Sequence, residues 1–332
     1  MSYRILVVVL VVLVVICFLL SLIAGETEIG FMDLFAIMAG DAVGPVADIH
    51  RLILQEIRLP RAILGLTVGF TLGLSGAAMQ GFLRNPLAEP GLIGVSASGA
   101  LGAVVAIYTG LSLWFPMALP LIAVATALLA VIILQWLSRG AGVLVLILSG
   151  VAISSLAGAL TSLVLNLSTN PFASLEIIHW MLGSITDRNM DHVILSLPFM
   201  MTGWVMLLTC GGKLEVLSLG EHTAQSMGVN LPRLRWQIIL GTGLAVGAAT
   251  SVSGVIGFLG LVVPHLMRPL VAYRPGRLLL ASGLVGAILL LLADIMVRML
   301  PLQVEIKLGV VTALLGAPFF FWLIFKTREG DL

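Results

Sequence analysis

Charged side chains are scarce in this sequence. Aspartate, glutamate, lysine and arginine make up 10% of the 332 residues, hydrophobic residues make up 60%, and the mean hydropathy is +1.16. The net charge at pH 7 is only +1. Soluble domains carry about 25% charged residues, and nucleic-acid-binding proteins carry a basic surface. The composition therefore excludes a soluble globular protein and a nucleic-acid binder, and it indicates a protein embedded in a lipid bilayer.

Groups that bind metals or carry out catalysis are also few. The two cysteines, Cys17 and Cys210, lie inside or at the end of apolar runs, without a second ligand at metal spacing or a clear disulfide mate. They are typical of small core residues. The five histidines are isolated, and neither H-E-x-x-H nor C-x-x-C occurs. We therefore expect no metal site, no cofactor and no enzymatic activity.

Long apolar runs are abundant. Ten stretches lie close to the ~20 residues that a helix needs to cross a bilayer. They are 5–24, 62–81, 92–109, 116–137, 143–166, 193–211, 235–253, 255–272, 278–299 and 307–325. Only SVSG (251–254) separates the seventh from the eighth, so a hairpin with a tight turn is expected there. The first run is longer than the ~7–15 apolar residues of a signal peptide, which favours an uncleaved first helix over a signal peptide.

The distribution of positive charge predicts the orientation. An even number of spans places both ends of the chain on one side. With the N-terminus inside, the inner segments hold 11 and the outer segments 6 of the 17 lysines and arginines. Membrane proteins have such an excess of cations on the cytoplasmic side. We therefore predict that both termini are cytoplasmic and that residues 1–332 form a single transmembrane domain.

Two glycine patterns predict close helix packing. Gly65, Gly69 and Gly73 recur at every fourth residue, and a second series at 254, 257 and 260 recurs at every third. Small residues at such spacing let membrane helices approach closely. We expect both stripes to serve packing, although they could also shape a transport pathway.

One polar segment, LEVLSLGEHTAQSMGV (214–229), interrupts the apolar pattern. Ser218 followed by Glu221 is a capping-box pattern, which predicts the start of a helix. Gly228 suits the left-handed residue that ends a helix, and Pro232 suits the start of the next one. The segment therefore predicts a helix of about two turns within a cytoplasmic loop, 212–234. So short a helix needs a packing partner.

Five stretches together resemble the FecCD-type permeases, the membrane subunits of ABC importers for iron-siderophores, heme and cobalamin. They are LGEHTAQSMGVNLP (219–232), RLPR (58–61), GAAMQGFLRNPLAEPGLIGVSASGA (76–100), GVIGFLGLVVPHLMRPL (254–270), and LLADIMVR with GVVTALLGAPFFFWLI (291–298 and 309–324). They follow one another in the order of the family. The resemblance implies an all-α integral membrane protein with about ten transmembrane helices and the type II ABC importer permease architecture.

The resemblance assigns roles to several residues. Ser218, Glu221, Ala224 and Gly228 match the loop that couples such permeases to their ATPase subunits. Arg58, Arg61 and Arg298 match arginines that contact carboxylates of the substrate-binding protein, a task that suits guanidinium groups. Anchoring of helix ends at the membrane interface is the alternative for the arginines.

Asp294 is the one carboxylate clearly inside a predicted span. It precedes Arg298 by four residues, so the two can form an ion pair on one helix face. An ionisable group at membrane depth is a functional candidate by default. We favour a structural ion pair over a functional role.

The fifth span carries a face of small and mildly polar residues. Ser155, Gly158, Ser162 and Asn166 follow at spacings of three, four and four, which places them on one side of a helix. In the FecCD family this span lines a channel between two permease subunits. Packing against a neighbouring helix is an equal alternative. The RGAGVL turn (139–144) lacks the hydroxyl residues of the cobalamin permease's inner constriction, so no gate residue is assigned.

No G-x-x-x-x-G-K-[ST] nucleotide loop occurs, so an importer of this kind would take its energy from another polypeptide. The resemblance implies ABC ATPase subunits, a periplasmic or lipid-anchored binding protein and a second permease, identical or related, in the bacterial inner membrane. An ion-coupled secondary transporter is disfavoured by the single embedded carboxylate and by the lack of a visible inverted repeat. We expect an iron chelate, siderophore or heme, as cargo, with cobalamin as the alternative.

Overall fold

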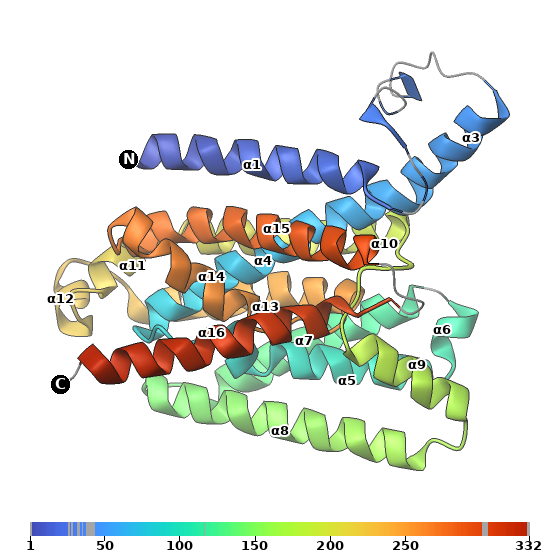
Figure 1. Ribbon diagram of the computed structural model, residues 1–332. Helices are drawn as coiled ribbons and strands as arrows, with labels where there is room; N and C mark the ends of the chain where they lie inside the picture. The colour runs from blue at the N-terminus through green and yellow to red at the C-terminus, as the bar shows by residue number, and fades with distance from the viewer. Residues whose placement is uncertain are drawn as a thin grey trace.

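The computed structural model describes residues 2–25, 27, 29–31, 34, 36–37, 44–115, 117–300 and 305–330. Throughout these residues the regular structure is helical, without strands. Long helices lie side by side as a bundle (Figure 1). This arrangement follows from the composition, because only helices and closed barrels satisfy their own backbone groups in lipid.

The helices follow one another along the chain. The first half contains α1 (Tyr3–Ile23), α3 (Pro45–Leu52), the π-helical η1 (Ile53–Arg58), α4 (Leu59–Leu83), η2 (Pro90–Ile93), α5 (Val95–Tyr108), α6 (Leu111–Trp114), α7 (Ala118–Leu137) and α8 (Val143–Leu167). The second half contains α9 (Pro171–Met181), α10 (Met190–Leu208), α11 (Gly211–Leu217), α12 (Glu221–Ser226), α13 (Leu231–Ser253), α14 (Leu259–Met267), η3 (Pro269–Val271), α15 (Pro275–Met299) and α16 (Leu308–Gly330).

The ten predicted spans appear as helical segments in the predicted order. Seven helical stretches of the described chain are long and apolar enough to cross a membrane, and one of them runs without a break from Pro45 to Leu83. Two further predicted spans correspond to shorter apolar helices, Val95–Tyr108 and Leu308–Phe321. The prediction of an all-helical membrane protein is confirmed.

The predicted span 255–272 is wrong as a membrane-crossing helix. α13 ends at Ser253, and Gly254 turns the chain with a φ of 67°. The following helix, α14, has nine residues, which is about 14 Å of helix against a hydrocarbon core of about 30 Å. Hydropathy alone could not separate this half-length helix from a full span. α14 packs against α4, α15 and α16 inside the bundle.

The glycine stripe of α4 packs against α15. A Cβ at Gly69 would overlap the carbonyl oxygen of Gly286, and a Cβ at Gly73 would overlap that of Ser282. These two helices share the most extensive contact in the bundle. The predicted packing role of the stripe is confirmed, and small residues on both helices allow the close approach.

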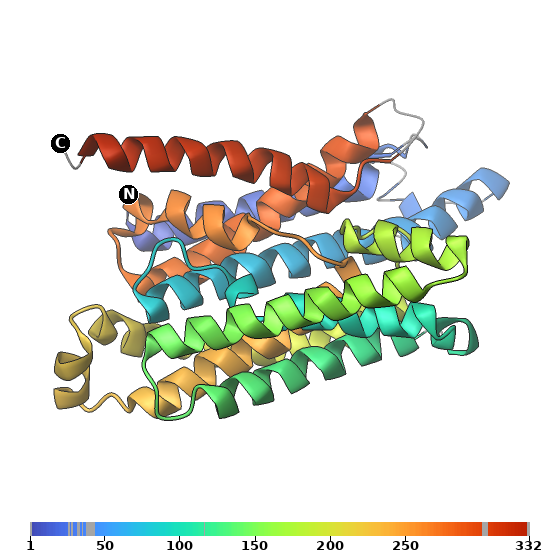
Figure 2. The same cartoon turned by 90° about the horizontal axis from the view of Figure 1, so that it is seen from below.

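The bundle has two distinct ends. The N-terminus, the end of α16 and the short helices α11 and α12 lie at one end, and α3 and α6 lie at the other (Figure 1). α8 lies on the outside of the bundle, along the lower edge in Figure 1 and in front in Figure 2. The helix order thus carries the polar 214–229 segment to the end that holds both termini.

Candidate functional site

Two short helices form the polar segment at the α12 end, where one helix was predicted. α11 ends at Leu217, and α12 begins at Glu221 after Gly220, which has a φ of 113°. Ser218 is therefore not an N-cap, because its hydroxyl donates to the carbonyl of Glu215 at 2.6 Å, within the last turn of α11. The predicted capping box between Ser218 and Glu221 is wrong. The same residues fit the end of one helix as well as the start of another.

The end of α12 follows the prediction. Gly228 has a φ of 85°, and its N–H donates to Gln225 while the N–H of Val229 donates to Ala224, both at 2.9 Å. This pair of bonds is a Schellman motif, which favours glycine at the left-handed position. α13 then starts with Asn230 as its N-cap and Pro232 in its first turn. The path of the chain out of α12 is thus set by local residues.

Ala224 anchors α12, and Glu221 ties it to the rest of the bundle. Ala224 is the only buried residue of α12 and belongs to the main hydrophobic core. Glu221 accepts from Arg84, the residue that caps the end of α4, at 2.9 Å. Leu219 and Met227 flank the helix with exposed apolar side chains. The α12 region therefore presents a small, fixed, partly apolar protrusion.

The loop after α4 also contacts the half-length helix α14. The carboxylate of Glu89 accepts the backbone N–H of Phe258, immediately before α14, at 2.9 Å. Phe258 has a φ of 66°, an uncommon conformation for a bulky residue. A carboxylate suits the N-terminal end of a helix. Burial raises the pKa of Glu89, although its bond to the Phe258 N–H acts in the opposite direction.

Arg58 lies at the opposite end of the bundle, and its side chain is almost fully buried. Its guanidinium donates to the carbonyls of Leu22 and Ile23 at 3.0 and 2.6 Å, and to that of Thr27 at 2.5 Å. The carbonyls of Leu22 and Ile23 lie in the last turn of α1, which leaves them without helical partners. Within its own chain, Arg58 therefore fixes the end of α1.

Asp294 lies between two arginines in the same region. Its carboxylate contacts Nε of Arg61 at 2.9 Å and Nη2 of Arg298 at 2.8 Å. The Asp294 side chain is completely buried. The predicted contact with Arg298 is present, and the contact with Arg61 had no signal in the sequence. Two cations around one carboxylate offset the cost of burying that charge.

Arg298 extends the cluster to α1. It donates to the carbonyls of Ser21 and Ala24, both at 2.9 Å, and to the Ser21 hydroxyl at 2.7 Å. Arg58, Arg61 and Arg298 thus all lie at this end of the bundle, and each is engaged by groups of its own chain.

Glu305 is a member of this cluster that sequence reasoning did not single out. Its carboxylate accepts from Arg61 at 2.5 Å and from the Thr186 hydroxyl at 3.0 Å. Burial alone would raise the pKa of Glu305, but the bonds from Arg61 and Thr186 outweigh it and lower the pKa. Its position shortly before an apolar run was the only sequence signal. The side chain is 31% exposed, so it can be reached from outside.

The four residues of the predicted pathway face lie on α8. Ser155, Gly158, Ser162 and Asn166 are all exposed in the single chain. A Cβ at Gly158 would meet nothing within 4 Å. Large apolar side chains of the same helix, among them Leu156, Leu160 and Leu163, are also exposed. No helix of the described chain covers this face.

Comparisons with known proteins agree on one family. The model of the FecCD transport family matches residues 13–326. The chain is 36% identical over 280 residues to the Fe(3+) dicitrate transport system permease protein FecD of Escherichia coli, covering 84% of this chain and 87% of that one. It is also 36% identical over 287 residues to the vitamin B12 import system permease protein BtuC of Vibrio cholerae, covering 86% of each.

A solved structure gives the same result for the fold. It is described as an inward-facing conformation of a metal-chelate type ABC transporter. It matches with a TM-score of 0.86 and 33% identity, over 98% of this chain and 100% of that chain. The fold is thus that of a type II ABC importer permease. The chain belongs to the FecCD transport family.

Proposed function

We propose that this permease imports an iron chelate, a siderophore complex or heme, across the bacterial inner membrane by alternating access that a separate ATPase drives. As a member of the FecCD family it is a multi-pass transport permease. The feature that carries the proposal is α12, a short helix fixed at one end of the bundle with polar and apolar side chains exposed around it. Cobalamin is the alternative cargo, which the similarity to BtuC favours.

Glu221, Ala224 and Gly228 are the proposed elements of ATPase coupling, with Ser218 at the end of α11. Ala224 is packed into the core, and the Gly228 turn joins α12 to α13. Movement of the ATPase dimer against α12 would therefore be passed to α13 and, through Arg84, to α4. Packed helices transmit such displacements as rigid bodies. The α12 end, with both termini, is then cytoplasmic.

We assign binding-protein docking to Arg58, Arg61 and Arg298, at the opposite and therefore periplasmic end. Glu305 already contacts the Arg61 guanidinium, at a position that is partly exposed. A carboxylate of the binding protein would compete with Glu305 for this guanidinium. Replacement of Glu305 by glutamine removes the competing charge and is expected to tighten binding-protein docking.

The docking test measures the affinity of the binding protein for the reconstituted permease at several salt concentrations. Glu305→Gln is expected to raise the affinity, and Arg58→Gln to lower it and to reduce its dependence on salt. Glu56→Gln is the matched control, because Glu56 is exposed at the same end of the bundle and the substitution makes the same change of charge. Unchanged affinity in Glu305→Gln would contradict docking at Arg61.

The exposed α8 face is the proposed pathway wall, with a second permease subunit opposite it. α8 has no ionisable side chain along Val143–Leu167, and its exposed face combines Ser155, Gly158, Ser162 and Asn166 with leucines. Such a surface offers no strong ligand for a bare metal ion, which favours a cargo that arrives as a complete chelate. The chain is then a homodimer, or a heterodimer with a related permease.

The cargo test uses vesicles that contain the permease, its ATPase subunits and the binding protein, with ATP inside. Uptake of ferric siderophore complexes, heme and cobalamin is measured separately in the same preparation. ATP-dependent accumulation of an iron chelate, with no accumulation of cobalamin, is the expected result. Accumulation of cobalamin alone would contradict the iron assignment and favour the alternative.

A further inference from the structure

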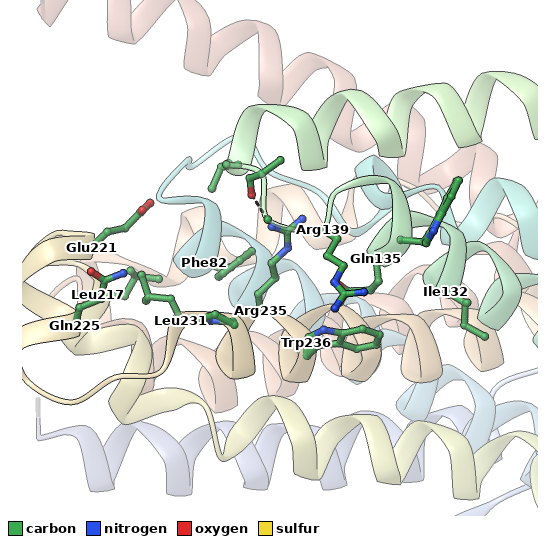
Figure 3. Close-up of a pocket in the computed structure, with 16 residues that line it drawn as sticks. Phe82, Ile132, Gln135, Arg139, Leu217, Glu221, Gln225, Leu231, Arg235 and Trp236 are labelled. Carbon is green, nitrogen blue, oxygen red and sulfur yellow. Dashed lines mark hydrogen bonds between the residues drawn. The ribbon is translucent and has the colours of Figure 1, made fainter.

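A cavity of about 760 Å³ opens beside the α12 end of the bundle, between the end of α7 and the start of α13. The loop between α7 and α8 closes one side of it. Figure 3 shows Gln135, Arg139 and Arg235 between these elements, with Trp236 below Arg139 in that view. None of these four side chains belongs to the proposed coupling helix, docking arginines or pathway face.

The charged side chains that line the cavity are mainly positive. Arg139 and Arg235 carry two positive charges, and Glu221 carries one negative charge. Glu221 is already engaged by Arg84 at 2.9 Å. Arg235 donates to the carbonyls of Ala141 and Ser138, at 2.7 and 2.6 Å, and so stays charged beside the cavity. Within the described chain, no carboxylate forms an ion pair with Arg139 or Arg235.

Two buried donors at the cavity have no acceptor in the described chain. They are Nε2 of Gln135 and Nε of Arg235. Gln135 is only 5% exposed. Buried polar groups are normally paired, so an unpaired one calls for a water, an ion or a ligand. Both groups are N–H donors; one of them belongs to the Arg235 guanidinium, and the Arg139 guanidinium lines the same cavity. This set favours an acceptor that carries negative charge.

Exposed apolar and aromatic side chains line the rim of the cavity. Trp136 on α7 is 74% exposed and Trp236 on α13 is 50% exposed, and both line the opening. Ile132, one turn before Trp136, is exposed as well. Tryptophan is enriched where a membrane helix meets the headgroup layer, because one part of the ring is apolar and the N–H is polar. The cavity therefore opens at the depth of lipid headgroups.

We infer that this cavity binds the phosphate group of an anionic phospholipid from the leaflet at the α12 end, through Gln135, Arg139 and Arg235. Basic pockets between membrane helices are suited to anionic headgroups. The phosphate accepts from the two unpaired donors and from Arg139, and the acyl chains lie against Trp136, Ile132 and Trp236. A lipid bound there holds α7 and the start of α13 together, next to α12.

The test uses the complex of permease and ATPase in vesicles of phosphatidylglycerol and phosphatidylcholine. Bromine on the acyl chains of one lipid at a time quenches nearby tryptophan fluorescence. Part of this quenching disappears in the double variant Trp136→Phe, Trp236→Phe. That part measures contact between lipid and the two tryptophans at the cavity. The ratio of quenching by the two brominated lipids gives the local enrichment of the anionic lipid.

The wild type is expected to enrich phosphatidylglycerol several-fold at the cavity. Arg139→Gln is expected to reduce the enrichment about fivefold, which corresponds to about 1 kcal/mol per basic residue near an anionic surface. Gln135→Leu, which removes the buried donor and keeps the size, is expected to reduce it as well. Arg233→Gln is the matched control and is expected to leave it unchanged, because Arg233 lies in the first turn of α13 outside the cavity.

Three results would overturn the inference. The first is equal enrichment in the wild type and in Arg139→Gln. The second is loss of the enrichment when inorganic phosphate is added in excess, which would assign the site to a free anion. The third is dissociation of the ATPase subunits from the Arg139→Gln permease while its lipid preference stays intact. That result would make the cavity part of the interface between permease and ATPase.

Discussion

Arg84, at the end of α4, and Glu221, at the start of α12, form an ion pair of 2.9 Å. The two residues are separated by 137 positions in the sequence. The pair links the proposed coupling helix to the helix that packs most extensively against α15. It therefore gives a route by which displacement of α12 reaches the centre of the bundle.

Reversing either charge of this pair should uncouple transport from ATP hydrolysis. Both side chains are nearly half exposed, so the pair contributes only ~0–1 kcal/mol to stability. Arg84→Glu and Glu221→Arg should therefore fold normally but transport less cargo per ATP hydrolysed. The double reversal Arg84→Glu, Glu221→Arg should restore the ratio. A double variant that stays uncoupled would show that Glu221 acts on the ATPase and not through Arg84.

Gly228→Ala should weaken coupling by distorting the end of α12. The φ of 85° at this position costs a residue with a Cβ ~1–2 kcal/mol. Gly212→Ala in the neighbouring helix α11 is the matched control, because its Cβ would meet nothing within 4 Å and alanine favours a helix. The ratio of transport to hydrolysis should fall in the first variant only. An equal ratio in both would refute a role for the Gly228 turn.

Gly73→Ala should destabilise the bundle. The new methyl group overlaps the carbonyl oxygen of Ser282, and relief requires α4 and α15 to separate. Overpacking of this kind costs ~1–3 kcal/mol. At Gly81, on the same helix, a new Cβ would meet only the side chains of Leu214 and Pro275, at 3.5 to 3.7 Å, so Gly81→Ala should be neutral. Thermal unfolding in detergent compares the two, and equal melting temperatures would contradict the packing role.

Asp294→Ala should destabilise the protein by ~3–5 kcal/mol, because it leaves the buried guanidinium groups of Arg61 and Arg298 without their shared carboxylate. Asp48→Ala removes a surface ion pair and should cost less than ~1 kcal/mol. Thermal unfolding in detergent measures the loss of stability in each of the two variants. A variant Asp294→Ala with unchanged melting temperature and no transport would contradict the structural assignment.

The sequence predicted structure correctly where the signal and its physical cause lie within a few residues of each other. Gly228 marks a helix end because its left-handed backbone favours glycine, and Pro232 marks a helix start because the first turn needs no N–H donor there. The repeat of Gly65, Gly69 and Gly73 marks a packing face because small residues at that spacing leave a groove. In each case the physical cause lies within a few residues.

Signals that depend on where other elements of the fold lie could not be read from the sequence. Ser218 fits a helix start and a helix end equally well, and only the position of α11 decides between them. Glu305 lies 244 positions from Arg61, so its contact has no local pattern. The half-length helix α14 lies in an apolar run as long as a full span, but its nine residues begin only after Phe258.

In the proposed mechanism, a separate ATPase drives the membrane-embedded body through α12. The most direct test of this mechanism is cargo uptake into vesicles that contain the permease, with the binding protein outside and ATP inside, with and without the ATPase subunits. We predict accumulation against a gradient only when the ATPase is present, and loss of that accumulation in Glu221→Arg. Accumulation by the permease without any ATPase would contradict the account.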